Sequence, residues 1–113
     1  MPADLVVKIR KGETRPVYGQ VLAPSGGTAT IAIGGKYTLY DGAGAVVIGH
    51  DNLDVTGYDS APGASPRAWK LLSTGALAEG AYRMVFTLSV TNSVDGMTRV
   101  LRPSVAVRVE PVV

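Results

Sequence analysis

The strongest constraint on the fold is the segment AYRMVFTLSVT at residues 81–91, in which apolar side chains occupy every second position. Neighbouring side chains of a β-strand point to opposite faces of the sheet, so this period predicts a strand with one buried face. That face consists of Tyr82, Met84, Phe86, Leu88 and Val90. Shorter segments with the same period are DLVVKIR at 4–10, PVYGQVL at 16–22, TATIAI at 28–33, KYTLYD at 36–41, RAWKLL at 67–72, TRVLR at 98–102 and SVAVRVE at 104–110, and GAVVIG at 44–49 is short and apolar.

Glycine and proline separate these segments, and no sustained apolar stripe of helical period occurs. Asp-Gly pairs, typical of tight hairpin turns, occur at 41–42 and 95–96. Pro103 cannot donate to a strand ladder, so it predicts an edge, a bulge or a strand that changes sheets. Roughly seven to nine short strands, with a turn signal about every 8–12 residues, predict an all-β, immunoglobulin-like antiparallel β-sandwich, with a β-barrel as the alternative.

The length of 113 residues predicts a single domain over 1–113, with MPAD and EPVV as short flexible termini. The absence of cysteine excludes disulfides, thiolate metal sites and a cysteine nucleophile. No apolar run is long enough for a membrane span, and the N-terminus does not have the pattern of a secretory signal. We therefore expect a soluble protein made in a cytoplasm, with no membrane partner.

The net charge of +2 comes from 11 basic and 9 acidic residues. Lys8, Arg10, Lys11 and Arg15 form the one local basic cluster. A nucleic-acid-binding surface usually has a denser basic stripe with interleaved aromatic residues. The sequence therefore predicts a solvated face at this cluster and no nucleic-acid partner.

The segment LAEGAY at 77–82 has the pattern of a tyrosine corner, in which a tyrosine at the start of a late strand bonds back to the backbone of the preceding corner. Leu77 would close the end of the core, Gly80 would permit the tight approach, and the Tyr82 hydroxyl would bond to the backbone. Trp69 would lie on a central strand facing Tyr82. A catalytic Tyr82 would need a neighbouring base or cation and a pocket, and only Arg83 is near in sequence.

No motif in the sequence predicts catalysis. The single histidine, His50, lies in GHDNLD with Asp51 and Asp54, where a metal site or part of a catalytic triad is conceivable. A zinc site lacks further His or Cys ligands, and a serine triad lacks a nucleophile elbow. DGAGAV from Asp41 lacks the third glycine and following helix of a dinucleotide loop. We expect a polar loop around His50, no metal, no cofactor and no enzymatic activity.

An interaction surface is the remaining candidate for a functional site. The loop at 57–68 is irregular, and loops of this length in compact domains often carry interactions. Tyr18, Tyr40 and Tyr58 are the tyrosines without an evident core position, and exposed tyrosines make good interface anchors. The candidate surface residues are Tyr40, Tyr58, Asp59, Pro62, Pro66 and Arg67.

Three longer segments resemble the small immunoglobulin-like virion structural domains of tailed bacteriophages, and in particular the N-terminal domain of the phage baseplate upper protein family. They are VVKIRKGETRPVYGQVL, with its G-[DE]-T-x-P turn, YTLYDGAGAVV, and EGAYRMVFTLSVTNSVDGMTRVLRPSVAVRVEP. The resemblance implies a non-enzymatic component of a tail, baseplate, adaptor or capsid decoration. Its location would be the virion, and its partners would be other virion proteins or copies of itself in a homo-oligomer.

Two other functions stay open at this point. A carbohydrate- or ligand-binding β-sandwich would use Tyr40, Tyr58 and the 57–68 loop, and clustered exposed aromatic residues on one sheet face would favour it. An enzyme is the least favoured class, because the sequence nominates no catalytic residues.

Overall fold

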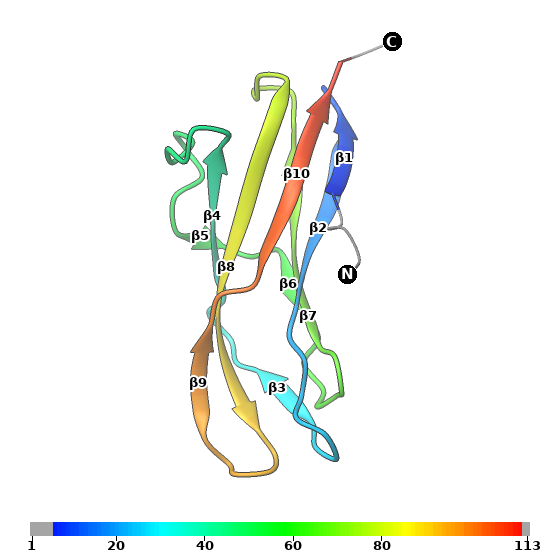
Figure 1. Ribbon diagram of the computed structural model, residues 1–113, viewed down its shortest axis with the longest axis vertical. Coiled ribbons are helices and arrows are strands. Elements are labelled where there is room, and N and C mark those ends of the chain that lie inside the picture. Colours follow the sequence, from blue (N-terminus) through cyan, green and yellow to red (C-terminus); the bar gives the residue numbers. More distant parts are fainter. Residues whose placement is uncertain (1–5, 112–113) are drawn as a thin grey trace.

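A computed structural model describes residues 6–111, and within that range it contains strands and no helix. Two β-sheets pack face to face, which confirms the all-β immunoglobulin-like sandwich (Figure 1). The expected termini MPAD and EPVV lie largely outside the described residues. Between residues 6 and 111 there is no helix that could span a membrane.

The larger sheet has seven strands around one long central strand, β8 (Gly80–Asn92). Its main order is β1-β10-β8-β4-β5, where β1 (Val6–Arg10) runs parallel to β10 (Ser104–Glu110) and the other pairs are antiparallel. β4 spans Lys36–Asp41 and β5 spans Leu53–Asp54. The second half of β8 pairs instead with β3 (Ala29–Ile31) and β9 (Thr98–Leu101) and forms an arm at one end of the molecule (Figure 1).

The smaller sheet has three strands in the order β2-β7-β6. β2 spans Thr14–Gln20, β7 spans Arg67–Ser73 and β6 spans Gly57–Tyr58. In immunoglobulin-like domains, strands B, E and D form one sheet, and strands C, F and G form the other. The sheets β2-β7-β6 and β4-β8-β10 match these two sets, so the chain has immunoglobulin-like topology.

The core lies between the inner faces of the two sheets. Along β8, Met84, Phe86, Leu88 and Val90 are buried and the residues between them are partly exposed, as the sequence period predicts. The largest fully buried side chains elsewhere in the core are Ile9, Val17, Tyr37, Leu39, Leu72, Val107 and Val109.

Glycine permits the tight turns at both Asp-Gly pairs. In the turn that begins at Asp41, the glycine in the left-handed region is Gly44 (φ 84°) and not Gly42 of the Asp-Gly pair, whereas at the second pair it is Gly96 (φ 68°). In the first turn, the Asp41 carboxylate accepts hydrogen bonds from the amides of Ala43 and Ala45. Both turns therefore form, although only an isolated bridge follows the first. Pro103 separates β9 from β10, and both strands pair with β8 in one register, so Pro103 marks neither a bulge nor a change of sheet.

Two strand predictions were wrong, one over its whole length and one at its C-terminal end. The segment GAVVIG forms no strand, but only an isolated bridge between Tyr40 and Val46, and Ile48 is 98% exposed. β3 ends at Ile31, so Ile33 lies on the surface at 86% exposure rather than in the core. Gly34, with a positive φ of 98°, lies in the short irregular segment between β3 and β4, and the chain resumes pairing with β8 at Lys36.

The start of β8 has the geometry of a tyrosine corner. The Tyr82 hydroxyl donates a hydrogen bond of 2.6 Å to the carbonyl oxygen of Ala78. Leu77 is buried, and Gly80 has φ of 142° where the chain enters the strand. Burial, followed by the charge of Asp41, raises the pKa of Tyr82, so the hydroxyl stays protonated and able to donate at neutral pH.

Trp69 does not face this corner, and the prediction that it does was wrong. The inner face of β7 carries Ala68 and Leu72, which are fully buried, so Trp69 and Leu71 point to the outer face. Lys70 also points inward, and its ammonium lies 5.3 Å from the ring centroid of Tyr37. Its aliphatic stem can cover apolar surface while its charge stays near the edge, which is how the inner face accommodates a lysine.

Removing the corner hydroxyl should destabilise the fold. The variant Tyr82→Phe leaves the Ala78 carbonyl without its donor, and we expect a loss of about 1–2 kcal/mol in the free energy of unfolding. Urea denaturation measures it. A Tyr82→Phe protein as stable as the wild type would show that this bond does not hold the corner.

Candidate functional site

The most distinctive surface is the outer face of the three-stranded sheet. The cross-strand register places Pro16 opposite Leu71, Tyr18 opposite Trp69, and Gln20 opposite Arg67. Because directly paired residues point to the same side of a sheet, these side chains share one face. We call Pro16, Tyr18, Arg67, Trp69 and Leu71 the aromatic face.

The members of the aromatic face contact one another. The rings of Tyr18 and Trp69 have centroids 6.0 Å apart and are tilted by 55°. The Arg67 guanidinium lies 4.5 Å from the Tyr18 ring centroid, within the range of a cation–π contact. Tyr18 and Leu71 are 40% and 44% exposed, so apolar surface remains open to solvent.

Gly57 on β6 provides the space that the indole of Trp69 occupies. A Cβ atom at Gly57 would lie 2.7 Å from Cζ2 of Trp69, closer than such atoms approach. The indole therefore lies over the backbone of its neighbouring strand, where a larger residue would displace it. Because Gly57 has no side chain, the indole of Trp69 can pack against β6 and is only partly exposed on the outer face.

Asp59 positions Arg67, the charged residue of the aromatic face. Its carboxylate accepts a hydrogen bond of 2.9 Å from the Arg67 amide and forms an ion pair with the guanidinium at 4.0 Å. Two of the residues nominated from the sequence, Asp59 and Arg67, thus lie together at the border of the aromatic face. Tyr18, one of the tyrosines predicted to lie outside the core, joins them, whereas Trp69 was expected inside the core.

Of the other nominated residues, Tyr58, Pro62 and Pro66 line one shallow hollow together with Asp59, outside the aromatic face. Tyr40 lies on the outer face of the larger sheet, opposite Arg83, while Tyr58 on β6 packs against the core. Pro66 is buried, and Pro62 is exposed in the loop. Of the site predicted from Tyr40, Tyr58 and the loop, Tyr58 therefore lies at one hollow with the loop, whereas Tyr40 belongs to the other sheet and lies apart from both.

His50 and its two neighbouring aspartates point to separate partners. His50 Nδ1 and the buried Tyr37 hydroxyl share a hydrogen bond of 2.8 Å. Asp54 pairs with Lys36, and Asp51 lies 3.5 Å from the Thr38 hydroxyl. Among residues 6–111, no three His, Cys, Asp or Glu side chains are grouped so as to hold a metal ion.

The surroundings of His50 predict a pH dependence of stability. Desolvation first, and then the charge of Lys70, lowers the pKa of His50 below its ordinary 6.5. The folded state therefore binds fewer protons than the unfolded state, and stability decreases as the pH falls below 6.5. We expect His50→Gln to flatten the unfolding free-energy profile between about pH 6.5 and 5.

Chemical denaturation at a series of pH values tests this expectation. Below about pH 4.5 both proteins should lose stability, because Glu13 and Asp95 have lowered pKa values and protonate there. Superimposable profiles of the wild type and His50→Gln above about pH 5 would contradict the role of His50.

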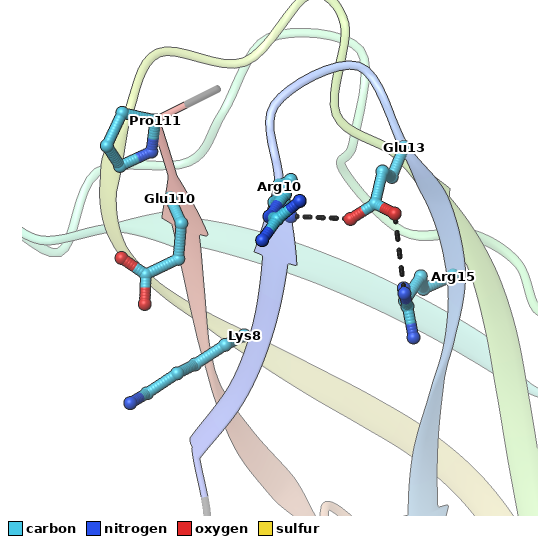
Figure 2. Close-up of a pocket in the computed structure, with 6 residues that line it drawn as sticks. All are labelled: Lys8, Arg10, Glu13, Arg15, Glu110 and Pro111. Atoms are coloured by element: carbon cyan, nitrogen blue, oxygen red, sulfur yellow. Dashed lines mark hydrogen bonds and ion pairs between the residues drawn. The ribbon is translucent and has the colours of Figure 1, made fainter. Parts of the chain in front are cut away.

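The basic cluster is divided between two environments. Lys8, Arg10 and Arg15 line a shallow hollow together with Glu13, Glu110 and Pro111, and Figure 2 shows Glu13 between the two arginines. The Glu13 carboxylate accepts hydrogen bonds from the Arg10 amide at 3.0 Å and from Arg15 at 3.3 Å. Lys11 turns away and donates to the Leu77 carbonyl. Two carboxylates thus offset much of the positive charge around this hollow.

The comparisons with known proteins identify no relative. No family model, no curated protein and no solved structure matches the chain. Its function therefore has to be argued from its own surface.

Proposed function

We propose that this chain is a non-enzymatic structural component of a bacteriophage virion that binds a neighbouring virion protein through its aromatic face. The single observation that carries the binding role is the group formed on one sheet face by exposed Tyr18, Leu71 and Arg67 together with partly exposed Trp69. Tyrosine, tryptophan and arginine are the residues that contribute most to protein–protein binding energy. The virion assignment rests on the resemblance of the three sequence segments.

The arrangement of the rings supports a protein partner over a sugar. A carbohydrate platform presents open ring faces for stacking, but Arg67 lies over the Tyr18 ring and the Trp69 indole lies against Gly57. The two rings are also tilted by 55° and do not form one flat platform. A protein interface tolerates such tilt, because its side chains fill the space between the rings.

The surroundings of the aromatic face also support an interface. Thr14 and Ser73 share a hydrogen bond of 2.9 Å at one end, and the Asp59–Arg67 ion pair lies at the other. An apolar centre with a polar rim is the usual composition of a specific protein interface. Carbohydrate or ligand binding by this face remains the second candidate, because Tyr18 and Trp69 are aromatic residues on one sheet face.

Co-sedimentation with phage particles tests the proposal. The wild-type chain should be detected in purified particles by mass spectrometry, and purified chain should rebind particles that lack it. Trp69→Ala should weaken rebinding by about 30-fold, the effect of losing roughly 2 kcal/mol at an interface anchor. Ile48→Ala is the matched control, because Ile48 is 98% exposed and lies outside the face.

Two results would contradict the proposal. One is the absence of the chain from purified particles. The other is rebinding by Trp69→Ala that equals the wild type, provided that circular dichroism shows both to be folded. Binding of an oligosaccharide that is lost in Trp69→Ala would favour the second candidate instead.

A further inference from the structure

In the described part of the chain, the outer edge of β9 has neither a proline nor a covering segment, and the charge of its one charged residue, Arg99, is offset by Asp95. Among residues 6–111, β9 pairs only with β8, and no strand lies on its other side (Figure 1). All four residues of β9 are exposed. Unpaired strand edges bind other strands, so proteins usually block them with proline, charge, short length or covering segments.

The other edges show these protections. β2 has Pro16, which lacks an amide hydrogen, and β5 and β6 have only two residues each. β1 has Lys8 and Arg10, and the Arg10 amide is already bonded to Glu13. β3 is covered by the loop, since Ala29 and Gly63 exchange two backbone hydrogen bonds.

The hydrogen-bond pattern of β8 and β9 shows which groups point to the open edge. The Phe86 amide donates to the Pro103 carbonyl at 2.9 Å, and the Asn92 amide donates to the Met97 carbonyl at 3.1 Å. Antiparallel bonded pairs alternate along a ladder, so Arg99 and Leu101 bond toward β8. The backbone groups of Thr98, Val100 and Arg102 therefore point away from it.

The side chains of β9 carry little unpaired charge, which suits pairing with a strand of the same kind. Val100 and Leu101 on β9 are 52% and 36% exposed, and Met97, just before β9, is 56% exposed. The charge of Arg99 is offset by Asp95, which it contacts at 2.8 Å. Two such edges can therefore approach each other without repulsion between unpaired charges at their centre.

We propose that β9 pairs antiparallel with β9 of a second copy of this chain, with the two-fold axis at Val100. In this register Val100 lies opposite its counterpart and Thr98 lies opposite Arg102 of the second copy, so every edge-facing group of these residues meets a complementary one. The second copy is favoured as the occupant because this edge is complementary to itself in backbone and in side chains. The β3-β8-β9 arm becomes one continuous sheet across the dimer. The aromatic face takes no part in this contact, so the proposal is independent of the function proposed above.

A charge exchange at Val100 tests the register directly. Sedimentation equilibrium of the wild type up to about 1 mM should show a monomer–dimer equilibrium. Val100→Lys or Val100→Glu alone places like charges opposite each other and should weaken dimerisation by more than about tenfold. An equimolar mixture of the two variants should form a heterodimer. Val100→Thr, which is β-branched and uncharged, is the matched control and should dimerise like the wild type.

Three results would overturn the proposal of a β9–β9 dimer. Circular dichroism checks that the variants fold, which we expect because Val100 is half-exposed. A wild type that stays monomeric throughout the concentration series overturns the proposal, and so does a dimer that Val100→Lys leaves intact. A dimer that is weakened by Trp69→Ala and not by Val100→Lys places the self-contact on the aromatic face and equally overturns it.

Discussion

Truncating Phe86 to alanine is expected to lower the free energy of unfolding by about 3–5 kcal/mol. Phe86 is fully buried near the middle of β8, the strand that pairs with most of the larger sheet. Its ring fills the space left by Gly19 on β2 of the opposing sheet. Loss of the ring removes apolar burial and leaves a cavity between the two sheets, and urea denaturation measures the combined effect.

The contact between Phe86 and Gly19 makes this expectation specific. A Cβ atom at Gly19 would lie 2.4 Å from Cδ2 of Phe86, so Gly19→Ala alone should destabilise the fold by about 1–3 kcal/mol. In the Phe86→Ala background the same methyl group enters the vacated space and should be neutral or stabilising. A double-mutant cycle measures this coupling. Additive effects would show that the two positions do not share the space.

Replacing Thr74 by valine should be the next most damaging change, with a loss of about 1–3 kcal/mol. Thr74 is fully buried, and its hydroxyl accepts from the Gly12 amide at 2.9 Å while lying 2.9 Å from the carbonyls of Arg10 and Glu13. These three residues form the turn by which the chain passes from the larger sheet to the smaller one. Valine keeps the shape of the side chain but leaves the Gly12 amide without an acceptor.

Serine at position 74 is the matched control. Thr74→Ser keeps the hydroxyl and removes one methyl group, so it should lose less stability than Thr74→Val in the same denaturation series. Equal losses in the two variants would assign the role of Thr74 to packing of its methyl group and would contradict a hydrogen-bonding role.

The period of the apolar residues predicts much of this fold. The alternation in residues 81–91 identifies the buried face of β8, because a strand with one face in the core and one in solvent requires that pattern. The Asp-Gly turns and the division at Pro103 follow from local backbone preferences that act within a few residues. Such features depend little on distant parts of the chain.

The position of Trp69 could not be predicted from the period of the apolar residues. The period in RAWKLL correctly puts Trp69 and Leu71 on one side, but it does not say which side is the core. Hydrophobicity alone favours the side with Trp69, since the other side includes Lys70. The outcome depends on Gly57 and Tyr18, which accept the indole on the outer face. These contacts are set by strand register and not by local sequence.

The aromatic face also depends on strand register. Asp59 and Arg67 were found because they flank an irregular loop, whereas Tyr18 is far away in sequence and meets them only through the pairing of β2 with β7. Tyr40 and Tyr58 were nominated as aromatic residues without an evident core position, and the register separates them. The prediction that Tyr18 lies outside the core is confirmed, and Val17 and Gly19 alternate with it on the buried face.

Hydroxyl-radical footprinting of the free chain and of the chain in purified particles tests whether the aromatic face is the surface that binds the virion. The method reports the solvent exposure of individual aromatic side chains by mass spectrometry. Binding through the aromatic face predicts strong protection of Tyr18 and Trp69 in the particle, with Tyr40 on the opposite sheet as the internal reference. Equal oxidation of Tyr18 and Trp69 in the free and particle-bound chain would contradict the assignment of the aromatic face as the binding surface.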